Sequence, residues 1–391
     1  MIELTGAEKL LSIKRMSNCY MCNRELNKNN RSVEHIFPNS IGGRLTSIKL
    51  LCKECNSNFG SKPDYELAKQ FNVFTNYLMV KRNRGNPTPI ELVNEKTGEK
   101  ISMDYEGMPI MEKPLVKETK ENDLIKFSIK SRSTKEARKI IAGLSRKYKK
   151  LNYKEVLNQA KNVETEITDP LYATISVGGK EPLPAILKIA LNYFIMKTED
   201  INSVCNAIND LKNNVREKVS IIILERHIFD LDDNEVSHSV YLIGSQVAQK
   251  LYAVVELFNT VQFVVKLSEN YCNSDFEDLY VFDVLLGKKK NKIIKYHPEL
   301  SFLFDFERPF SDQDIESYKH NISRILQIAQ KRRQEAYLNK VVNEAWDDII
   351  TKNGLEGGIM TPEIANCLSS RVAKDMVNYY CRMSGNSFRL K

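Results

Sequence analysis

Two short cysteine motifs and the polar residues between them are the part of this sequence best equipped for chemistry. Residues 19–22 and 52–55 each begin and end with cysteine, with two residues between the thiols. This spacing lets a tight turn present both sulfurs to one tetrahedral ion, so the two motifs together could hold a structural zinc. The predicted ligands are Cys19, Cys22, Cys52 and Cys55.

Between the motifs stand Glu34 and His35, and Asn56 follows the last cysteine directly. A histidine with an unperturbed pKa near ~6.5 can take a proton from water at neutral pH. Carboxylate and amide oxygens are ligands for hard cations such as Mg²⁺ or Mn²⁺. These residue types suit a hydrolysis in which a base activates water and a cation neutralises developing charge.

Other interpretations of the motifs make different demands on the sequence. A zinc finger would need a histidine or cysteine shortly after His35, where residues 39–41 are Asn, Ser and Ile. A thioredoxin-like redox site would need one Cys-x-x-Cys motif in a βαβ setting, and this chain has two motifs without that setting. A purely structural zinc site with an incidental His35 stays open as the simplest alternative.

The arrangement of these pieces resembles the HNH endonuclease family, the ββα-metal nucleases, in the branch with paired cysteine motifs. The resemblance covers residues 16–62. Besides the first motif, the matching parts are Glu-His-Ile-x-Pro from Glu34, the Gly42-Gly43 turn, and Leu-x-Cys-x-x-Cys-Asn-x-x-x-Gly ending at Gly60. Several constrained pieces in the right order make the resemblance specific within that span.

The resemblance implies a one-metal mechanism for hydrolysing a phosphodiester. His35 would be the general base, while Glu34 and Asn56 would hold a Mg²⁺ or Mn²⁺ ion beside the structural zinc. Many family members carry a histidine within or just after the last motif, so Asn58 is an alternative ligand to Asn56. Asn39 would orient His35 or contact phosphate, and a turn residue before the glycines is its equally weighted alternative.

Basic residues supply candidate contacts to a nucleic acid. The 58 Lys and Arg residues exceed the 50 Asp and Glu residues, which permits a polyanionic partner. Residues 133–136 read as a capping box, and the helix that it predicts has a basic face that could follow a DNA backbone. A solvated face balanced by acidic neighbours is the equally weighted alternative. The candidate residues are Arg44, Lys53, Arg138, Lys139, Arg146 and Lys147.

The elements that must position these residues follow from local patterns. Helices are expected at residues 64–81, 134 onward, 185–196, 311–353 and 361–382. Strands are expected at residues 90–93, 100–105, 124–129, 219–224, 239–243, 251–258, 261–267 and 280–284. Asn259-Thr260 is expected to be a hairpin turn, and the basic cluster at residues 288–290 a loop.

The predicted fold class is α+β. An N-terminal ββα-metal module, residues 1–82, is held by a zinc ion with four cysteine ligands. It precedes a larger mixed α/β region, residues 83–391, with antiparallel strands and C-terminal helices. A further boundary is expected near residues 165–215, and the helical part covers residues 311–391. The 391 residues are too many for one small domain.

Composition indicates the compartment in which the protein is expected and the state of its cysteines there. An apolar fraction of 42% is ordinary for a soluble protein, and the most apolar stretch, residues 251–267, is interrupted by Glu256, Asn259 and Gln262 and cannot span a membrane. The N-terminus is charged where a signal peptide would be apolar, so we expect a cytoplasmic protein. In that reducing compartment, cysteine motifs favour metal over disulfides. The scattered cysteines, Cys205, Cys272, Cys367 and Cys381, are expected to be buried.

The sequence therefore predicts an endonuclease acting on DNA, with RNA not excluded. The small nuclease module leaves target choice, signal sensing or dimerisation to the rest of the chain, through an activating ligand or a partner protein. This layout resembles bacterial restriction or antiphage effectors, by architecture alone. The alternatives are a mobile-element or homing nuclease and a non-catalytic zinc-held DNA-binding protein.

Overall fold

The computed structural model describes residues 18–383, apart from residues 84, 97, 99, 106, 108, 111–113, 122–123, 132, 149–150, 159, 162–170, 305–308 and 354–359. Contacts divide the chain into two compact units. One unit comprises Met1–Pro87 and Ile175–Ile328, and the other Thr88–Thr174 and Ala329–Lys391. The domain boundary expected after residue 82 stays a prediction, and its first 17 residues lie outside the described part.

The first unit begins with the expected ββα arrangement. Its strands are β1 (Glu34–His35) and β2 (Thr46–Ser47), and a short 3-10 turn, η1 (Asn39–Ile41), lies between them. Helix α1 (Lys53–Ser61) follows the second cysteine motif. The single helix expected at residues 64–81 is instead two helices, α2 (Pro63–Gln70) and α3 (Asn72–Tyr77), because the backbone leaves helical geometry at Phe71.

A six-stranded antiparallel sheet forms the largest part of the first unit, with the strand order β14-β13-β10-β11-β12-β9. All five strands expected between residues 219 and 284 are present. The loop prediction for residues 288–290 is wrong, because they pair with β13 as an edge strand. Lysines suit such an edge, since they discourage pairing with another chain. The strands are β9 (Val219–Ile222), β10 (Ser237–Ser245), β11 (Lys250–Leu257), β12 (Val261–Ser268), β13 (Phe276–Asp283) and β14 (Lys288–Lys290).

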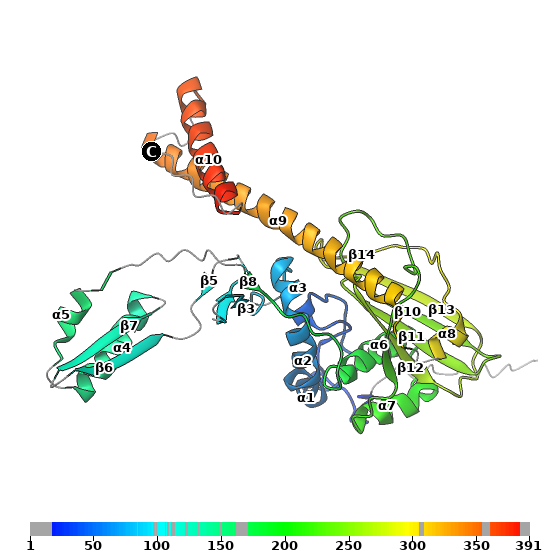
Figure 1. The fold of residues 1–391 in the computed structure, drawn as a ribbon. Helices are drawn as coiled ribbons and strands as arrows, with labels where there is room; N and C mark the ends of the chain where they lie inside the picture. Colours follow the sequence, from blue (N-terminus) through cyan, green and yellow to red (C-terminus); the bar gives the residue numbers. More distant parts are fainter. Residues whose placement is uncertain are drawn as a thin grey trace, which may run out of the picture. The chain divides into compact units, whose positions relative to one another are not determined.

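Both faces of this sheet are covered. Side chains of β10 to β13 on one face pack around Ile228, Phe229 and Leu303. Helices α6 (Leu183–Thr198) and α7 (Cys205–Lys212) contact β12, and α6 also contacts β10 and β11 (Figure 1). Helix α6 is apolar on nearly every side, as expected of a helix enclosed by its neighbours.

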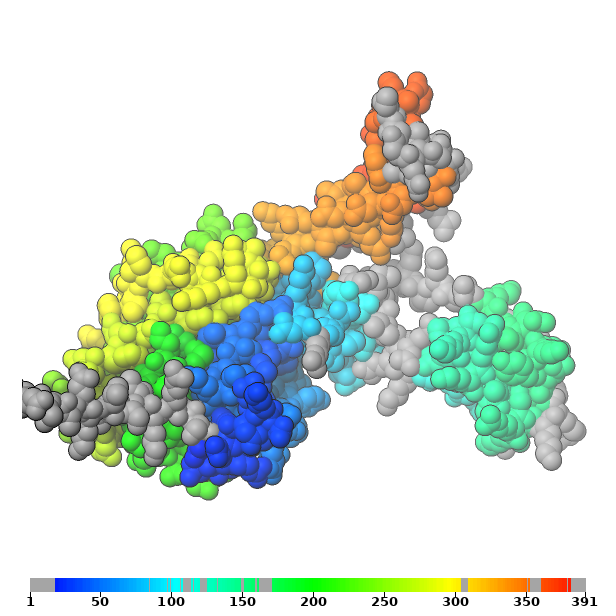
Figure 2. Space-filling view, turned by 180° about the vertical axis from the view of Figure 1, so that it is seen from behind, coloured from blue at the N-terminus to red at the C-terminus, as the bar shows by residue number. Residues whose placement is uncertain are grey.

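The N-terminal module packs against this sheet and α6 within the same unit (Figure 2). The ring of Phe37 stacks on His238 of β10 at 5.1 Å, and Phe71 stacks on Phe258 at 5.6 Å. The buried His238 Nε2 donates to the carbonyl of Ile41, while its Nδ1 accepts from Phe258. The loop between β1 and β2 is thereby fixed by the sheet behind it.

The second unit contains two small sheets and the helices of the C-terminal part. Residue Ser133 accepts a hydrogen bond from the backbone of Glu136, so the predicted capping box starts α4. The sheets are β5-β4-β3-β8 and β6-β7. Their strands are β3 (Ile90–Asn94), β4 (Lys100–Met103), β5 (Pro109–Ile110), β6 (Leu115–Glu121), β7 (Leu124–Lys130) and β8 (Leu171–Tyr172). The short helices of this unit are α4 (Thr134–Lys147) and α5 (Tyr153–Asn158), whereas η2 (Asn202–Val204) and α8 (Leu300–Phe304) belong to the first unit.

Two long helices end the described part of the chain, α9 (Asp312–Asn353) and α10 (Pro362–Met383). Tyr337 and Tyr379 stack between them with ring centroids 4.2 Å apart. The fold is therefore the predicted α+β class with antiparallel sheets and C-terminal helices. Within the described residues, no helix combines the length and apolarity needed to cross a membrane.

Candidate active site

The four cysteines of the two motifs converge as predicted. Their sulfur atoms all lie within 4.8 Å of one another, and the sulfurs of Cys22 and Cys52 are 3.7 Å apart. Zinc–sulfur bonds of about 2.3 Å in a tetrahedron place ligand sulfurs about 3.8 Å apart, so the cluster fits zinc. The other cysteines were wrongly expected to be buried: Cys205, Cys272 and Cys367 are exposed, and the side chain of Cys381 lies outside the description.

Local backbone structure positions the four cysteines, which together form the zinc frame. Asn23 adopts a left-handed conformation at φ 59°, which closes the turn of the first motif, and its backbone N–H donates to Cys19. In the second motif, Cys52 is the residue that precedes α1. The residues around Cys52 also hold the segment before β1, because the backbone N–H of Ser32 donates to Leu51 and that of Lys53 donates to Asn30.

On β1, Glu34 and His35 face opposite sides, as neighbouring strand residues must. Glu34 is only 1% exposed and points into the interior. His35 is half-buried at the surface. Burial lowers the pKa of His35, and the nearby cations Lys188 and Arg44 lower it further. The imidazole is therefore neutral at physiological pH, the form in which it can accept a proton.

Buried Glu34 is held by α6. Its Oε1 accepts from Lys188 Nζ at 2.8 Å and from Asn192 Nδ2 at 3.0 Å. Lys188 Nζ also donates to Asp64 Oδ2 at 2.6 Å, which brings the first turn of α2 into the same cluster. Tyr20, inside the first cysteine motif, donates to Asn192 Oδ1 at 2.7 Å.

Sequence reasoning missed Asp64, Lys188 and Asn192. A signal was present, because Lys188 and Asn192 are one turn apart on the same side of a helix whose other residues up to Ile195 are mostly apolar. Two polar residues so placed indicate a buried polar partner. The identity of that partner could not be read, since Glu34 is 154 residues away from Lys188.

Two further asparagines surround His35. Asn83 Nδ2 lies 3.4 Å from His35 Nε2, a long contact. Asn39 does not bond to His35 among the described residues; its Oδ1 accepts from the backbone N–H of Asn83 at 2.9 Å. Asn39 thus orients the segment that carries Asn83.

Asn56 and Asn58, the two candidate amide ligands, both lie on α1. Asn56 is half-buried, and its Nδ2 donates to Ser32 Oγ at 2.5 Å. That bond leaves its carbonyl oxygen facing no donor among the described residues. Asn58 is exposed. Among the described residues, neither asparagine contacts Glu34, so contacts do not decide which of the two would be the metal ligand.

The chemistry of the free oxygens fits a divalent ion. The described residues supply no donor to Glu34 Oε2, and Asp64 Oδ1 is buried without a hydrogen-bond partner. Mg²⁺ and Mn²⁺ prefer such carboxylate oxygens. The mismatch is Lys188, whose ammonium already neutralises part of the carboxylate charge; the two carboxylates hold its pKa above the ordinary value although burial opposes this.

The candidate phosphate-binding residues are divided between the two units. Arg44 donates to the carbonyl of Lys81 at 2.8 Å, and Lys53 is exposed at the start of α1. The other four, all exposed on α4, belong to the second unit: Arg138, Lys139, Arg146 and Lys147. Lys147 pairs with Glu118 at 3.8 Å, so part of that basic face is balanced by an acidic neighbour.

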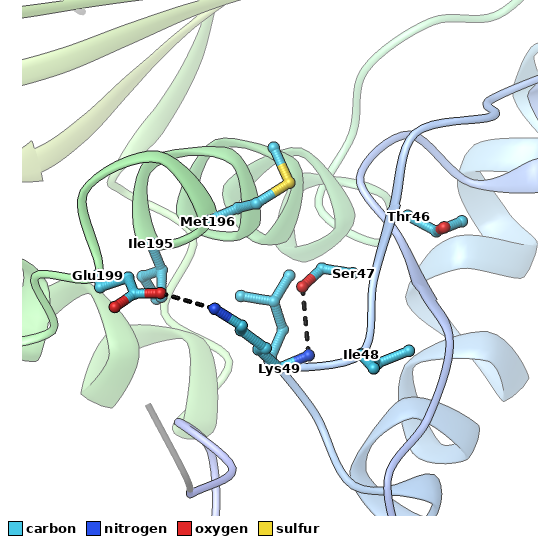
Figure 3. Close-up of a pocket in the computed structure, with 8 residues that line it drawn as sticks. Thr46, Ser47, Ile48, Lys49, Ile195, Met196 and Glu199 are labelled. Carbon is cyan, nitrogen blue, oxygen red and sulfur yellow. Dashed lines mark hydrogen bonds and ion pairs between the residues drawn. The ribbon is translucent and has the colours of Figure 1, made fainter. Parts of the chain in front are cut away.

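A pocket of about 330 Å³ lies between the segment of β2 and the end of α6 (Figure 3). The ion pair of Lys49 and Glu199, 2.9 Å long, crosses it. Neither Glu34 nor His35 lines this pocket, so it is separate from the candidate site.

Comparison with known proteins agrees with this geometry. Residues 19–72 match a family model described as HNH endonuclease, which confirms the resemblance predicted from the sequence. Comparisons with curated proteins and with solved structures returned no match. The match covers the four cysteines, β1, β2 and α1, and extends through α2, which carries Asp64, to Asn72.

Proposed function

We propose that the chain is an endonuclease that hydrolyses DNA phosphodiester bonds, with His35 as general base. The observation that carries the proposal is a half-buried His35 that directly follows Glu34 on β1, inside the segment that matches the HNH endonuclease family. That family match supports a nuclease or nucleic-acid-binding role on its own. The choice of DNA and the residue roles are ours.

His35 would take a proton from the attacking water. The contact of Asn83 with Nε2 is 3.4 Å long, so a water molecule can compete for this nitrogen. Asn83, fixed by Asn39, would keep the ring from turning away. Arg44 is near enough to influence the pKa of His35 and would add positive charge for a bound phosphate.

Glu34 and Asn56 would hold a Mg²⁺ or Mn²⁺ ion beside the zinc frame. When bound, such an ion supplies positive charge to the phosphate and the departing oxygen. Support comes from the unbonded oxygens of Glu34 and Asn56, and from the preference of these ions for oxygen ligands.

The test is plasmid cleavage with Mg²⁺ or Mn²⁺ by wild type, His35→Ala and His320→Ala. We expect His35→Ala to lose about 10²–10⁴-fold in rate. His320 is exposed on α9, so its replacement controls for losing a surface histidine. Equal nicking by wild type and His35→Ala would remove the claim that His35 is catalytic. No nicking with any ion would leave the non-catalytic DNA-binding alternative. An RNA substrate in parallel tests the choice of nucleic acid.

We also propose a restriction or antiphage role for this nuclease in bacteria. The support is architectural: a second unit with a basic helix accompanies a small nuclease module. Plaque counts on cells that express wild type or His35→Ala test it, with fewer plaques expected only for wild type. Equal plaque counts, together with cleavage at one long site, would favour the mobile-element alternative.

A further inference from the structure

The ammonium of Lys188 lies between two carboxylates of the candidate site. Its Nζ is 2.8 Å from Glu34 Oε1 and 2.6 Å from Asp64 Oδ2. The lysine side chain is only 1% exposed. This charged group is therefore shielded from solvent and reaches the oxygen atoms that a divalent ion would need.

Such a cluster is costly for a structural purpose alone. Removing charges from water costs several kcal/mol per ion, and apolar residues at all three positions would avoid that cost. One lysine also leaves two carboxylates short of positive charge. Glu34 Oε2 receives no donor from the described residues, and Asp64 Oδ1 is buried without a partner. The cluster thus has room, in charge and in ligands, for a stronger cation.

We propose that Lys188 is an internal substitute for the divalent ion, and that the ion binds Glu34 and Asp64 only when Lys188 withdraws. This inference rests on the proposed nuclease function for its biological meaning. It names Asp64 as an additional ligand and α6 as the element that controls ion binding.

The surroundings allow Lys188 to leave without dismantling the site. Asn192 still donates to Glu34, and Tyr20 fixes the Asn192 amide through its oxygen, so Glu34 keeps its orientation. The Nζ of Lys188 already lies 5.3 Å from the centre of the Phe59 ring, whose face can accept a cation. A lysine that leaves the carboxylates therefore has an aromatic ring within reach.

The α6 helix joins this lysine to the sheet. It contacts β10, β11 and β12, and its last turn lines the pocket between Ile48 and Met196. A displacement of α6 would move Lys188 relative to Glu34, because the same helix carries Lys188 and the residues that contact the sheet and the pocket. Ion binding would then depend on the position of α6 on the six-stranded sheet.

The experiment measures Mn²⁺ binding to zinc-loaded full-length protein by electron paramagnetic resonance, for wild type and Lys188→Met. If Lys188 competes with the ion, its removal lowers the apparent Kd by about ten-fold or more, about 1.4 kcal/mol. The thermal midpoint of Lys188→Met should also rise more with Mn²⁺ than that of wild type, since the ion replaces the missing charge.

A second variant, Asp64→Asn, keeps the Glu34–Lys188 pair, and we expect a ten-fold or greater rise in the apparent Kd for Mn²⁺. Lys290→Met is the matched control, because Lys290 also pairs with two carboxylates, of Asp232 and Asp283, but outside the site. Its Mn²⁺ affinity should equal that of wild type.

The proposal is overturned if folded Lys188→Met binds Mn²⁺ as weakly as wild type or more weakly, which would make Lys188 a positioning residue. Should Lys188→Met not fold, Lys188→Gln takes its place under the same criterion. An unchanged affinity in Asp64→Asn also contradicts it. Because binding is measured without DNA, a failure of the nuclease proposal would appear separately, in the His35→Ala comparison.

Discussion

Two buried carboxylates in the first unit, those of Glu256 and Glu34, differ in how their charges are stabilised. Glu256 on β11 is 3% exposed and receives hydrogen bonds on both oxygens: His227 and Gln262 contact Oε1, and Asn259 contacts Oε2. Burial acts to raise the pKa of Glu256, but these hydrogen bonds outweigh it and lower the pKa. This carboxylate is fully satisfied and belongs to the structure of the sheet.

Glu34 has the opposite balance. Burial raises its pKa and outweighs Lys188, and both of its hydrogen bonds fall on one oxygen. Its neighbour Asp64 leaves one buried oxygen without a partner. The difference teaches that a buried charge with complete partners serves stability, whereas one with unused ligand capacity indicates a site that binds something else.

The largest effect is expected when the cysteine ligands of the zinc ion are removed, because the segment that carries Glu34 depends on them. We expect the double variant Cys52→Ser and Cys55→Ser to lose zinc and unfold the N-terminal module, since structural zinc contributes about 10–16 kcal/mol of apparent binding energy in small zinc domains. Zinc content and limited proteolysis within residues 19–72 measure this. Cys205→Ser with Cys272→Ser is the control, because both residues are exposed outside the motifs. A folded, zinc-free and active double variant would refute the structural zinc.

Replacing each carboxylate by glutamine should separate stability from activity. Glu256→Gln leaves His227 without its charged partner, and we expect the free energy of unfolding to fall by about 3 kcal/mol. Glu34→Gln leaves Lys188 paired with Asp64, so we expect a loss of about 1 kcal/mol but at least about 100-fold slower cleavage. Urea unfolding and cleavage rates per folded molecule give both values. Similar stability losses in the two variants would remove the distinction.

The pH dependence of stability tests the structural role of the Glu256–His227 pair. Burial opposes the charged form of His227, but Glu256 outweighs it and raises the pKa of His227 above its unfolded value. The stabilisation is therefore present below the unfolded pKa of about 6.5 and is lost as pH rises through the folded pKa. We expect His227→Gln to cost about 1.5 kcal/mol near pH 5.5 and much less at pH 9. A cost independent of pH in urea titrations would show that the pair is not ionic.

The smallest effect is expected at Asn83. Its long contact with His35 only orients the ring, so Asn83→Ala should slow cleavage by about three- to ten-fold, as the loss of one modest hydrogen bond predicts. Stability should not change, because residue 83 is at the surface. Loss of activity as large as that of His35→Ala would instead assign Asn83 a direct role.

Local patterns predicted much of this molecule. The cysteine spacing, the capping box at Ser133 and the Asn259-Thr260 turn depend on residues close in sequence, and all appear in the structure. The lysine strand at residues 288–290 was missed because its pairing comes from β13, not from its own composition. The partner of Glu34 was missed for the same reason: α6 is remote in sequence, and only the packed fold brings Lys188 to it.

The separation of 154 residues between Glu34 and Lys188 also has a meaning in time. During synthesis at about 5–20 residues per second, the zinc motifs and Glu34 are complete on the order of 10–30 s before α6 is made. A nascent chain could thus fold its cysteine frame while Glu34 still awaits its cation. If Lys188 competes with the ion, this competition begins only when α6 has been made and has packed against Glu34.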